Sequence, residues 1–547
     1  MKFLRFGLFF LCALIAFRAM RSQSPENYRE LLTLRVRARN LPAPPHLKAY
    51  VQDNKIRLSL RDAILLALEN DSDIQIEETS IETRKFSLLG AWSPFDPNLQ
   101  SSLNINRYSY PGYSQLQGIG ESSNATLNSL TQTGQINYIE TFTTGTAINV
   151  GISSSKSSTN SSFYFFNPYF STSLNLQFTQ PLLRNAGRFA QTAPINIARR
   201  SLSQSRATFE ALVNDAILQV VTQYWAAVQA RGALDVQQRA LNLAQVSYER
   251  DKRALELGAL PPLDISRSES EVAARKVQAI QAEYALGQAE EGLRLIVGAD
   301  QDPETVTLPF ELSEKPEPKT DPGTIDAGEV LQEALSNRPE LEAARDALEG
   351  DETAIGLARN QLKPDLQLQG FYQSTGLGGN QYSLDTGKLT STGGLGTSFN
   401  QLFGFGFPGY GAQLTLNLPV RNRAGQARLG NALVARTHDL YTNRQVQEQI
   451  TRQVRDVLHQ FETAKLSVTA ATTSVDLARK SLAADQRKFE LGAETNFFVL
   501  DSQSRLANAE LTLLQTQVSY QIAIAALNHA TGTLLAPYHL QIQSMSK

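Results

Sequence analysis

Four stretches of the chain alternate apolar and polar residues with a period of two. In residues 97–108, Leu99, Leu103 and Ile105 alternate with glutamine, serine and asparagine. A period of two is typical of β-strands that have one apolar and one polar face. Such strands fit either an antiparallel sheet on a soluble core or a barrel with lipid outside and water inside. The strands predicted in this way are residues 97–108, 172–180, 365–373 and 411–418.

One further hairpin is a candidate for the same sheet. Residues 136–141 and 147–152 flank the turn Thr144-Gly145-Thr146. The sequence leaves open whether the hairpin 136–152 joins the other strands. We therefore expect four strands per chain, or six if it does.

Four long segments predict helices that run in pairs. Residues 194–257 and 425–491 are rich in Gln, Ala, Arg and Leu and predict helices of roughly 60 residues, about 90 Å long. Each is followed by a shorter helix, residues 264–298 or 495–531. The narrow apolar stripes of the shorter helices are rich in alanine, whose small side chain allows helices to pack closely in a coiled coil.

Two more helices precede the strands. They cover residues 60–91 and 326–362, and a proline follows the end of each. We expect a kink at Pro339, because proline removes a helical hydrogen bond.

The second half of the chain repeats the first. Leu257-Gly258-Ala259 reappears as Leu491-Gly492-Ala493, and Gly298 reappears as Gly532, with 492 − 258 = 532 − 298 = 234. Each half runs helix, strands, long helix, glycine-containing turn and helix. We assign residues 57–300 and 325–532 to two repeats, residues 301–324 to a surface-exposed Pro-rich linker and residues 533–547 to a C-terminal tail.

The N-terminus has the pattern of a signal peptide. An apolar stretch of residues 6–17 follows Lys2 and Arg5, so residues 1–22 predict a cleaved export signal. Residues 23–56 read as an N-terminal periplasmic extension without periodicity. Beyond the signal, no run of 18 apolar residues occurs, so we expect any membrane insertion to use strands.

Composition excludes several function classes. The formal charge is −2, from 51 basic and 53 acidic side chains, and basic blocks are absent, so nucleic acid is not an expected partner. Cys12 is the only cysteine, which leaves no disulfide or thiol chemistry. The five histidines are scattered and no nucleophile motif surrounds a serine. We expect neither an enzyme nor a bound metal or cofactor.

Few strands per chain predict an oligomer. A sheet in lipid cannot leave its edges unpaired, because each lost backbone hydrogen bond costs several kcal/mol. Three chains of four strands give about twelve strands, which can leave a bore, whereas eight strands are filled by side chains. We therefore expect a homotrimer with one shared barrel and a wall of long helices around a tunnel.

The doubled order of elements resembles the TolC family of outer-membrane efflux proteins, the outer membrane factors. The resemblance rests on that order, on the strand exit Thr179-Gln180-Pro181-Leu182-Leu183 and on the turns at residues 256–259 and 490–493. It implies a mixed α+β membrane protein and a trimeric channel-tunnel. The shared twelve-stranded β-barrel would lie in the outer membrane of a Gram-negative bacterium, in contact with its lipid, and the α-helical coiled-coil barrel in the periplasm.

The resemblance also implies partners. Such a channel serves a tripartite efflux pump or a type I secretion system, together with a periplasmic membrane-fusion adaptor and an inner-membrane RND, ABC or MFS transporter. The cargo and the transporter class stay open. A structural coiled-coil stalk or adhesin is the alternative from another class, and single-channel conductance would distinguish the two. A general diffusion porin is disfavoured by the long helices.

The hairpin turns are the candidate adaptor-docking elements. Glycine permits a tight reversal and the small neighbouring alanine allows another helix tip to approach, although a plain helix cap explains the same residues. The docking candidates are Arg253, Leu257, Gly258, Ala259, Arg487, Leu491, Gly492 and Ala493.

Two aspartates and a phenylalanine are the candidate gate. Three symmetry copies of Asp501 would form a negative ring at the tunnel mouth. Asp264 follows Pro261-Pro262-Leu263 and is equally well explained by the helix dipole. Phe498 stands where the register with Asp264 would place a second carboxylate, so we expect a partly hydrophobic gate.

Overall fold

The computed structural model describes residues 47–112, 117, 126–257, 262–300, 305–318, 325–383 and 385–540. The chain divides into two compact units. We call residues 84–202 with 347–439 the sheet unit, and residues 47–83, 203–346 and 440–540 the helical unit. The predicted signal peptide, residues 1–22, lies outside the described residues.

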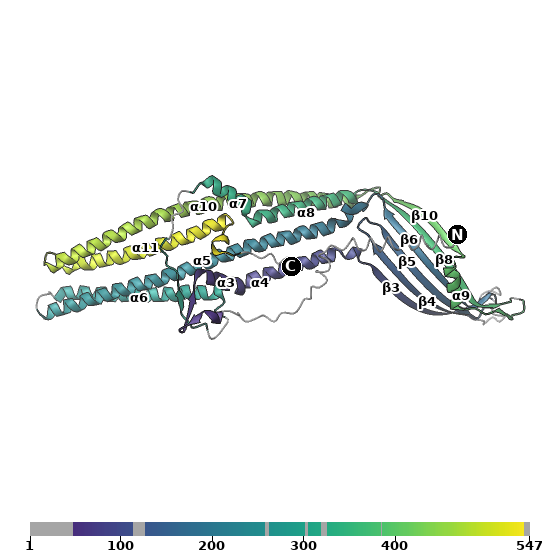
Figure 1. Cartoon of the computed structure of the whole chain (residues 1–547), viewed down its shortest axis with the longest axis horizontal. Helices are drawn as coiled ribbons and strands as arrows, with labels where there is room; N and C mark the ends of the chain where they lie inside the picture. The colour runs from purple at the N-terminus through teal and green to yellow at the C-terminus, as the bar shows by residue number, and fades with distance from the viewer. Residues whose placement is uncertain are drawn as a thin grey trace. The chain divides into compact units, whose positions relative to one another are not determined.

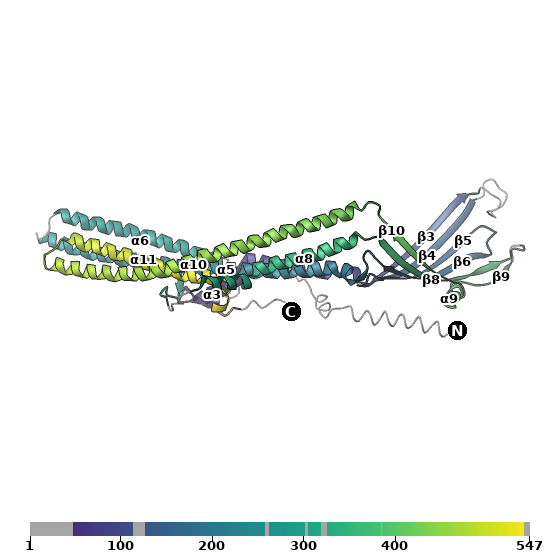
Figure 2. The same cartoon turned by 90° about the horizontal axis from the view of Figure 1, so that it is seen from above.

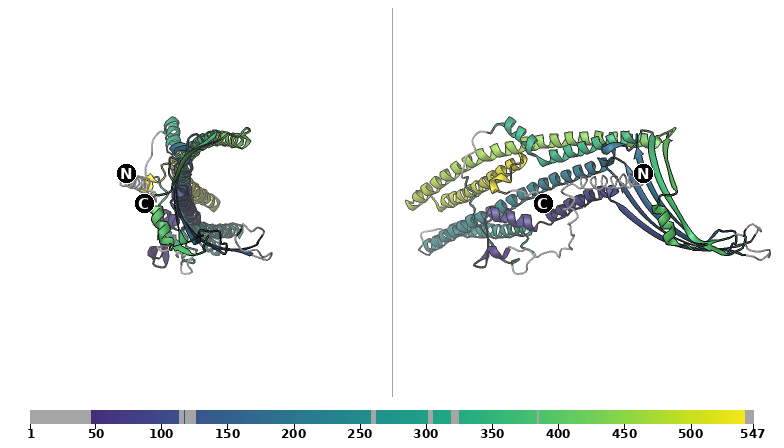
Figure 3. Two further views of the ribbon diagram at one scale, coloured as in Figure 1. Left: turned by 90° about the vertical axis from the view of Figure 1, so that its right-hand side faces the viewer. Right: turned by 45° about the vertical axis from the view of Figure 1, so that its right-hand side comes forward.

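The sheet unit contains six long antiparallel strands (Figure 1). Their order across the sheet is β10-β8-β6-β5-β4-β3, and the short β9 (Leu389–Ser391) pairs with β8. Figure 3 shows these strands side by side, bending along their length. The bounds are β3 (Asn98–Pro111), β4 (Thr126–Thr141), β5 (Ala147–Thr159), β6 (Phe166–Pro181), β8 (Asp365–Tyr382) and β10 (Pro408–Asn417).

The register separates an apolar face from a polar one. One row of paired residues across the sheet is Leu99, Tyr138, Val150, Leu176, Tyr372 and Tyr410. The neighbouring row is Gln100, Asn137, Gly151, Asn175, Gln373 and Gly409. Successive residues of a strand point to opposite faces. We call the face of the first row the apolar face and that of the second the polar face.

The candidate hairpin 136–152 joins the sheet. Thr141 pairs with Ala147 at its turn, β4 continues onto β3, and β5 continues onto β6. The described part of the chain therefore has six long strands, the larger of the two expected numbers.

Strand β8 is longer than the predicted residues 365–373. It runs to Tyr382 and keeps its pairing with β6 through Gly376 and Gly378. A glycine in a strand marks close approach of other backbone as well as a turn. Here that backbone belongs to α9 (Leu395–Phe403), a helix that the sequence analysis missed and that contacts β8 and β6 (Figure 2).

The helical unit is built on two helical hairpins. The first joins α5 (Gly187–Glu256) to α6 (Pro262–Val297), and the second joins α10 (Arg423–Glu490) to α11 (Asn496–Ala530). Both long helices begin in the sheet unit. Among the described residues, no helix is long and apolar enough to span a membrane.

Helix α5 begins earlier than residue 194, the start we expected from Pro194. Gly187 has φ +83° and opens the helix, with Pro194 inside it. A proline near the start of a helix removes one hydrogen bond of a long ladder, and tertiary packing outweighs that loss. Ala193 and Ile195, on either side of the proline, are buried.

The helix predicted over residues 60–91 is two helices. Asp71 takes an extended conformation between α3 (Leu60–Asn70) and α4 (Ser72–Ala91), and its carboxylate accepts the backbone N–H of Asp73 at 2.8 Å. Residues 326–362 are likewise two helices, α7 (Ala327–Asn337) and α8 (Pro339–Gln361), which meet at the proline expected to kink them.

Two segments expected to lack regular structure form a small sheet. The order is β1 (Val51–Gln52), β2 (Lys55–Leu58) and β7 (Phe310–Leu312), and β7 lies in the Pro-rich linker. Phe310 is 1% exposed, so the expectation that this linker lies on the surface is wrong there. Phe310 belongs to the main hydrophobic core of the helical unit. The guanidinium of Arg294 lies 5.1 Å from its ring and donates to the Leu308 carbonyl.

The main core of the helical unit surrounds Tyr224 on α5. Its side chain is fully buried among residues of α3, α5, α6 and the small sheet. The Tyr224 hydroxyl contacts the carboxylate of Glu314 and the Leu58 carbonyl. Burial and this carboxylate raise the pKa of Tyr224 well above its usual value.

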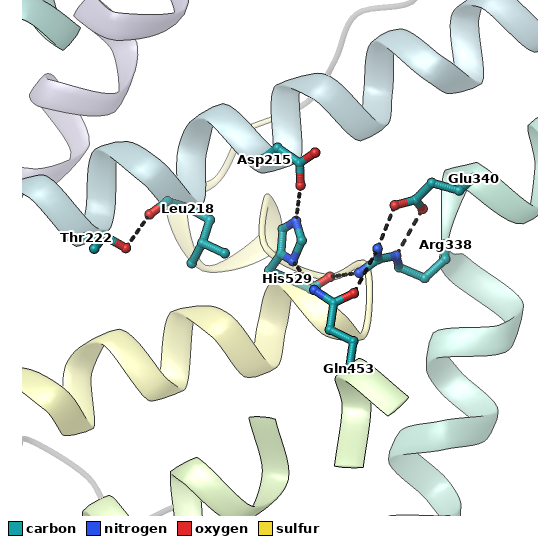
Figure 4. A network of polar contacts seen from close by, with 7 residues as sticks. All are labelled: Asp215, Leu218, Thr222, Arg338, Glu340, Gln453 and His529. Carbon is teal, nitrogen blue, oxygen red and sulfur yellow. Dashed lines mark hydrogen bonds and ion pairs between the residues drawn. The ribbon is translucent and has the colours of Figure 1, made fainter. Parts of the chain in front are cut away.

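A polar network joins four segments of the helical unit (Figure 4). Arg338, between α7 and α8, pairs with Glu340 at 2.6 Å and donates to the His529 carbonyl on α11 at 3.1 Å. The His529 ring contacts Asp215 on α5 at 2.7 Å. Arg338 also donates to Gln453 on α10. This network ties the second repeat to the long helix of the first.

The network predicts that Arg338→Met destabilises the protein by about 1–3 kcal/mol, because it leaves buried acceptors without a donor. Thermal unfolding of the purified protein in detergent measures this as a lower midpoint. Arg345→Met is the control, since Arg345 is exposed on the same helix α8, and its midpoint should stay near the wild-type value. Equal midpoints for the two variants would contradict the role of the network.

Candidate functional site at the ends of the helical hairpins

The second hairpin reverses through a tight glycine cap. Gly492 has φ +72°, its N–H donates to the Phe489 carbonyl, and that of Ala493 donates to Lys488, both at 2.9 Å. These bonds are those of a Schellman motif, which favours glycine at the left-handed position. Leu491 is 78% exposed beside it, so the turn presents an apolar side chain to its surroundings.

The first hairpin presents the equivalent leucine. Helix α5 ends at Glu256, and Leu257 is 84% exposed. Arg253 and Arg487 are exposed in the last turns of α5 and α10. Gly258 and Ala259 lie in residues 258–261, outside the described residues.

Each hairpin is closed by an aspartate and a serine at equivalent repeat positions. The Ser268 hydroxyl donates to buried Asp251, and the Ser502 hydroxyl donates to Asp485 at 2.5 Å. The Ser502 bond, with help from nearby Lys488, lowers the pKa of Asp485. Asp251 and Ser268 recur as Asp485 and Ser502 at the 234-residue shift. This recurrence was the sequence signal for the two contacts.

A polar bridge, made by a side chain that the second repeat alone supplies, joins the two hairpins. The Asn496 amide donates to Asp251 at 2.6 Å and accepts from the Arg250 guanidinium at 2.8 Å. Arg250 also lies over the Phe489 ring, 4.5 Å from its centroid. The repeat position of Asn496 is 496 − 234 = 262, which is Pro262. Proline has no polar side chain, so the first repeat has no counterpart of the bridge.

The gate candidates lie on the helices that follow the turns. Asp501, 37% exposed at its side chain, pairs with Arg505 of the same helix at 2.8 Å. Phe498 is 48% exposed and packs edge-on against Phe497. The backbone of Asp264 lies in the first turn of α6. Sequence reasoning missed Arg505, although the spacing of four residues along a helix signals such a pair.

The ends of the two hairpins thus combine exposed leucines, carboxylates and arginines. Among the residues that the structure describes, no group of three His, Cys, Asp or Glu side chains is placed to hold a metal ion.

Comparison with known proteins identifies the family. The family model described as outer membrane efflux protein matches residues 147–299 and 330–533, which is more than half of the chain. The two matched segments fall in the two repeats. This match confirms the resemblance that the sequence indicated.

Relatives and solved structures agree with the match. The chain is 25% identical over 369 residues to the outer membrane protein TolC of Vibrio cholerae, covering 66% of this chain and 77% of TolC. It is 24% identical over 310 residues to the probable efflux pump outer membrane protein TtgC of Pseudomonas putida, covering 56% of this chain and 58% of TtgC. A membrane protein of Pseudomonas aeruginosa has a similar fold, with a TM-score of 0.60 at 17% identity over 91% of this chain and 99% of that one.

Members of this family are channels rather than enzymes. The chain belongs to the outer membrane efflux protein family and is an efflux channel component of the outer membrane.

Proposed function

We propose that three copies of this chain enclose a water-filled duct that carries cargo across the outer membrane. The observation that carries the proposal is the sheet of six long strands, which has one apolar face, one polar face and, within the described residues, two open edges. The duct would be the exit of a tripartite efflux pump or a type I secretion system.

The open edges support assembly with further copies. Within the described residues, β3 pairs only with β4, and β10 pairs with β8 alone. Every residue of β3 is exposed. Unpaired backbone groups in hydrocarbon cost several kcal/mol each, and only closed barrels avoid this cost. Pairing of β3 of one copy with β10 of the next removes both edges.

The strand number enlarges the expected barrel. Three copies of six strands make eighteen, in place of the twelve that the resemblance implied. Barrel diameter grows roughly in proportion to strand number, and barrels of 16–18 strands leave an aqueous channel. The polar face, rich in glutamine, asparagine, serine and threonine, would line this channel.

The hairpin ends support docking of a periplasmic adaptor, with an inner-membrane RND, ABC or MFS transporter behind it. In a ring of three chains, six turns would face the adaptor. Arginine is among the side chains that contribute most binding energy at protein interfaces, and the exposed leucines would add apolar contact area beside it. The docking residues are Arg253, Leu257, Gly258 and Ala259 of the first hairpin, and Arg487, Leu491, Gly492 and Ala493 of the second.

The same end would gate the duct. Three copies of Asp501 paired with Arg505 would form a ring of alternating charge, and Phe498 would narrow it with an apolar side chain. Asp264 would add charge from the first hairpin. The Asn496 bridge ties the two hairpins of one chain together. Between chains, Pro262 gives no equivalent bond, so the seams between copies would separate first.

Recordings in planar lipid bilayers test the channel. The purified protein should produce discrete single-channel current steps, and the conductance of the open channel should not depend on voltage. A stalk or adhesin would leave the bilayer without current steps, and that result would contradict the proposal.

The gate predicts opposite effects of two charge changes. Asp501→Asn should weaken block by divalent cations, raising the blocking concentration by up to about fivefold, since exposed charge interactions amount to at most about 1 kcal/mol. Arg505→Gln frees the Asp501 carboxylate and should lower that concentration. Cation titration of single-channel conductance measures both. Unchanged block in both variants would remove this pair from the gate.

The bridge predicts that Asn496→Ala favours the open end of the duct. The substitution removes hydrogen bonds to two charged groups, worth about 2 kcal/mol at the hairpin ends. We expect a larger mean conductance at unchanged barrel stability. Asn508→Ala, an exposed change on the same helix, is the control and should conduct like the wild type. A wild-type conductance for Asn496→Ala would exclude the bridge from gating.

A further inference from the structure

The helix α9 covers part of the apolar face of the sheet. Thr172 on β6 and Ser374 on β8 contact the helix. Thr172 pairs with Gly376 across the sheet, and Ser374 pairs with Leu174. Each of these residues lies an even number of positions from Leu176 on β6 or Tyr372 on β8, so all of them point to the apolar face. The helix therefore lies on the side of the sheet that the proposed function turns toward lipid.

The docking of α9 uses polar and small groups. The Thr172 hydroxyl donates to the Ser398 carbonyl at 3.0 Å, and the Ser374 hydroxyl donates to the Leu402 carbonyl at 2.9 Å. All four residues are fully buried. The Gln401 side chain accepts the Leu377 N–H at 2.9 Å. Polar groups of the helix are thus satisfied against the sheet.

Glycines of β8 bring the helix into backbone contact. A Cβ at Gly376 would lie 1.9 Å from the Ser398 carbonyl oxygen, and one at Gly378 would lie 2.3 Å from that of Gly394. Any side chain there would push the helix off the strand. The helix and the sheet are therefore built to fit closely.

Leu402 is buried against the sheet, but the apolar side chains on the other flank of α9 lie largely outside this contact. Leu395 is 43% exposed and Phe403 is 55% exposed, and Phe399 stacks on Phe403 with ring centroids 6.1 Å apart. Positions 395, 399 and 403 share one flank of a helix. Phe407, just beyond the helix, is 62% exposed. A helix that covers a sheet in water would bury this flank.

The segment that contains α9 carries no charge. From Leu389 to Val420 the chain has no Asp, Glu, Lys, Arg or His. A segment with polar groups satisfied inward, aromatic side chains outward and no charge fits the boundary between lipid headgroups and hydrocarbon.

We propose that α9 is a lipid-embedded helix that lies on the outer surface of the barrel, with Leu395, Phe399, Phe403 and Phe407 inserted among acyl chains. The strand hydroxyls of Thr172 and Ser374 replace the water that would otherwise satisfy its carbonyls. The helix anchors each copy in the membrane in addition to its strands. This inference rests on the proposed placement of the apolar face in lipid.

Spin labels at single cysteines test the proposal. Cys12→Ser removes the only native cysteine. Labels are placed at Phe403→Cys and at Leu395→Cys, a second site on the same flank. Leu368→Cys reports the apolar face of β8, and Gln373→Cys reports its polar face. The labelled protein is reconstituted in phosphatidylcholine vesicles, and collision rates with oxygen and with a water-soluble nickel complex are measured.

We expect the oxygen-to-nickel collision ratio at positions 403 and 395 to match that at position 368 and to exceed that at position 373 severalfold. If the label at position 368 faces lipid but the labels at positions 403 and 395 collide with nickel, α9 lies in water. That result would overturn the inference about α9 and leave the proposed function standing. Low collision rates with both reagents at 403 and 395 would mean that protein covers α9, which also overturns it. Nickel collisions at 368 would refute the placement of the sheet in lipid as well.

Discussion

The architecture depends on the backbone hydrogen bonds at the two edges of the sheet. Water can satisfy the free N–H and C=O groups of β3 and β10, but hydrocarbon cannot. A protein of the outer membrane that carries an open sheet must therefore complete it with other chains. In the proposed trimer, closure would send the polar face inward around water and the apolar face outward to lipid, so assembly and conduction would have the same cause.

The two repeats form hairpins of the same architecture but differ in the side chain at one equivalent position. Asp251 with Ser268 and Asp485 with Ser502 close the two hairpins alike. Asn496 then bridges the hairpins, whereas its repeat counterpart Pro262 cannot. A ring of three chains would thus alternate between bonded and unbonded seams. In the proposed trimer, this one difference between the repeats would give the tunnel a defined place to open.

The sequence predicted those elements whose signal is local. Period-two alternation located the strands, proline-free stretches located the long hairpins, and the repeat located the turns at Leu257 and Gly492. Features that depend on distant partners were missed. Gly376 resembles a loop residue until α9 covers it, and Phe310 resembles a linker residue until Arg294 packs on its ring. At the candidate gate, Asp501 was found but its pairing with Arg505 was overlooked.

Chemical cross-linking of the two sheet edges tests closure most directly. Leu103→Cys on β3 and Leu414→Cys on β10 place thiols on exposed positions of the two edge strands, in a chain that also carries Cys12→Ser. A short bismaleimide applied to native membranes should convert the double variant to a covalent trimer, while either single variant stays monomeric on a denaturing gel. A reaction that yields only monomers, or that stops at a covalent dimer, would contradict a barrel shared by three chains.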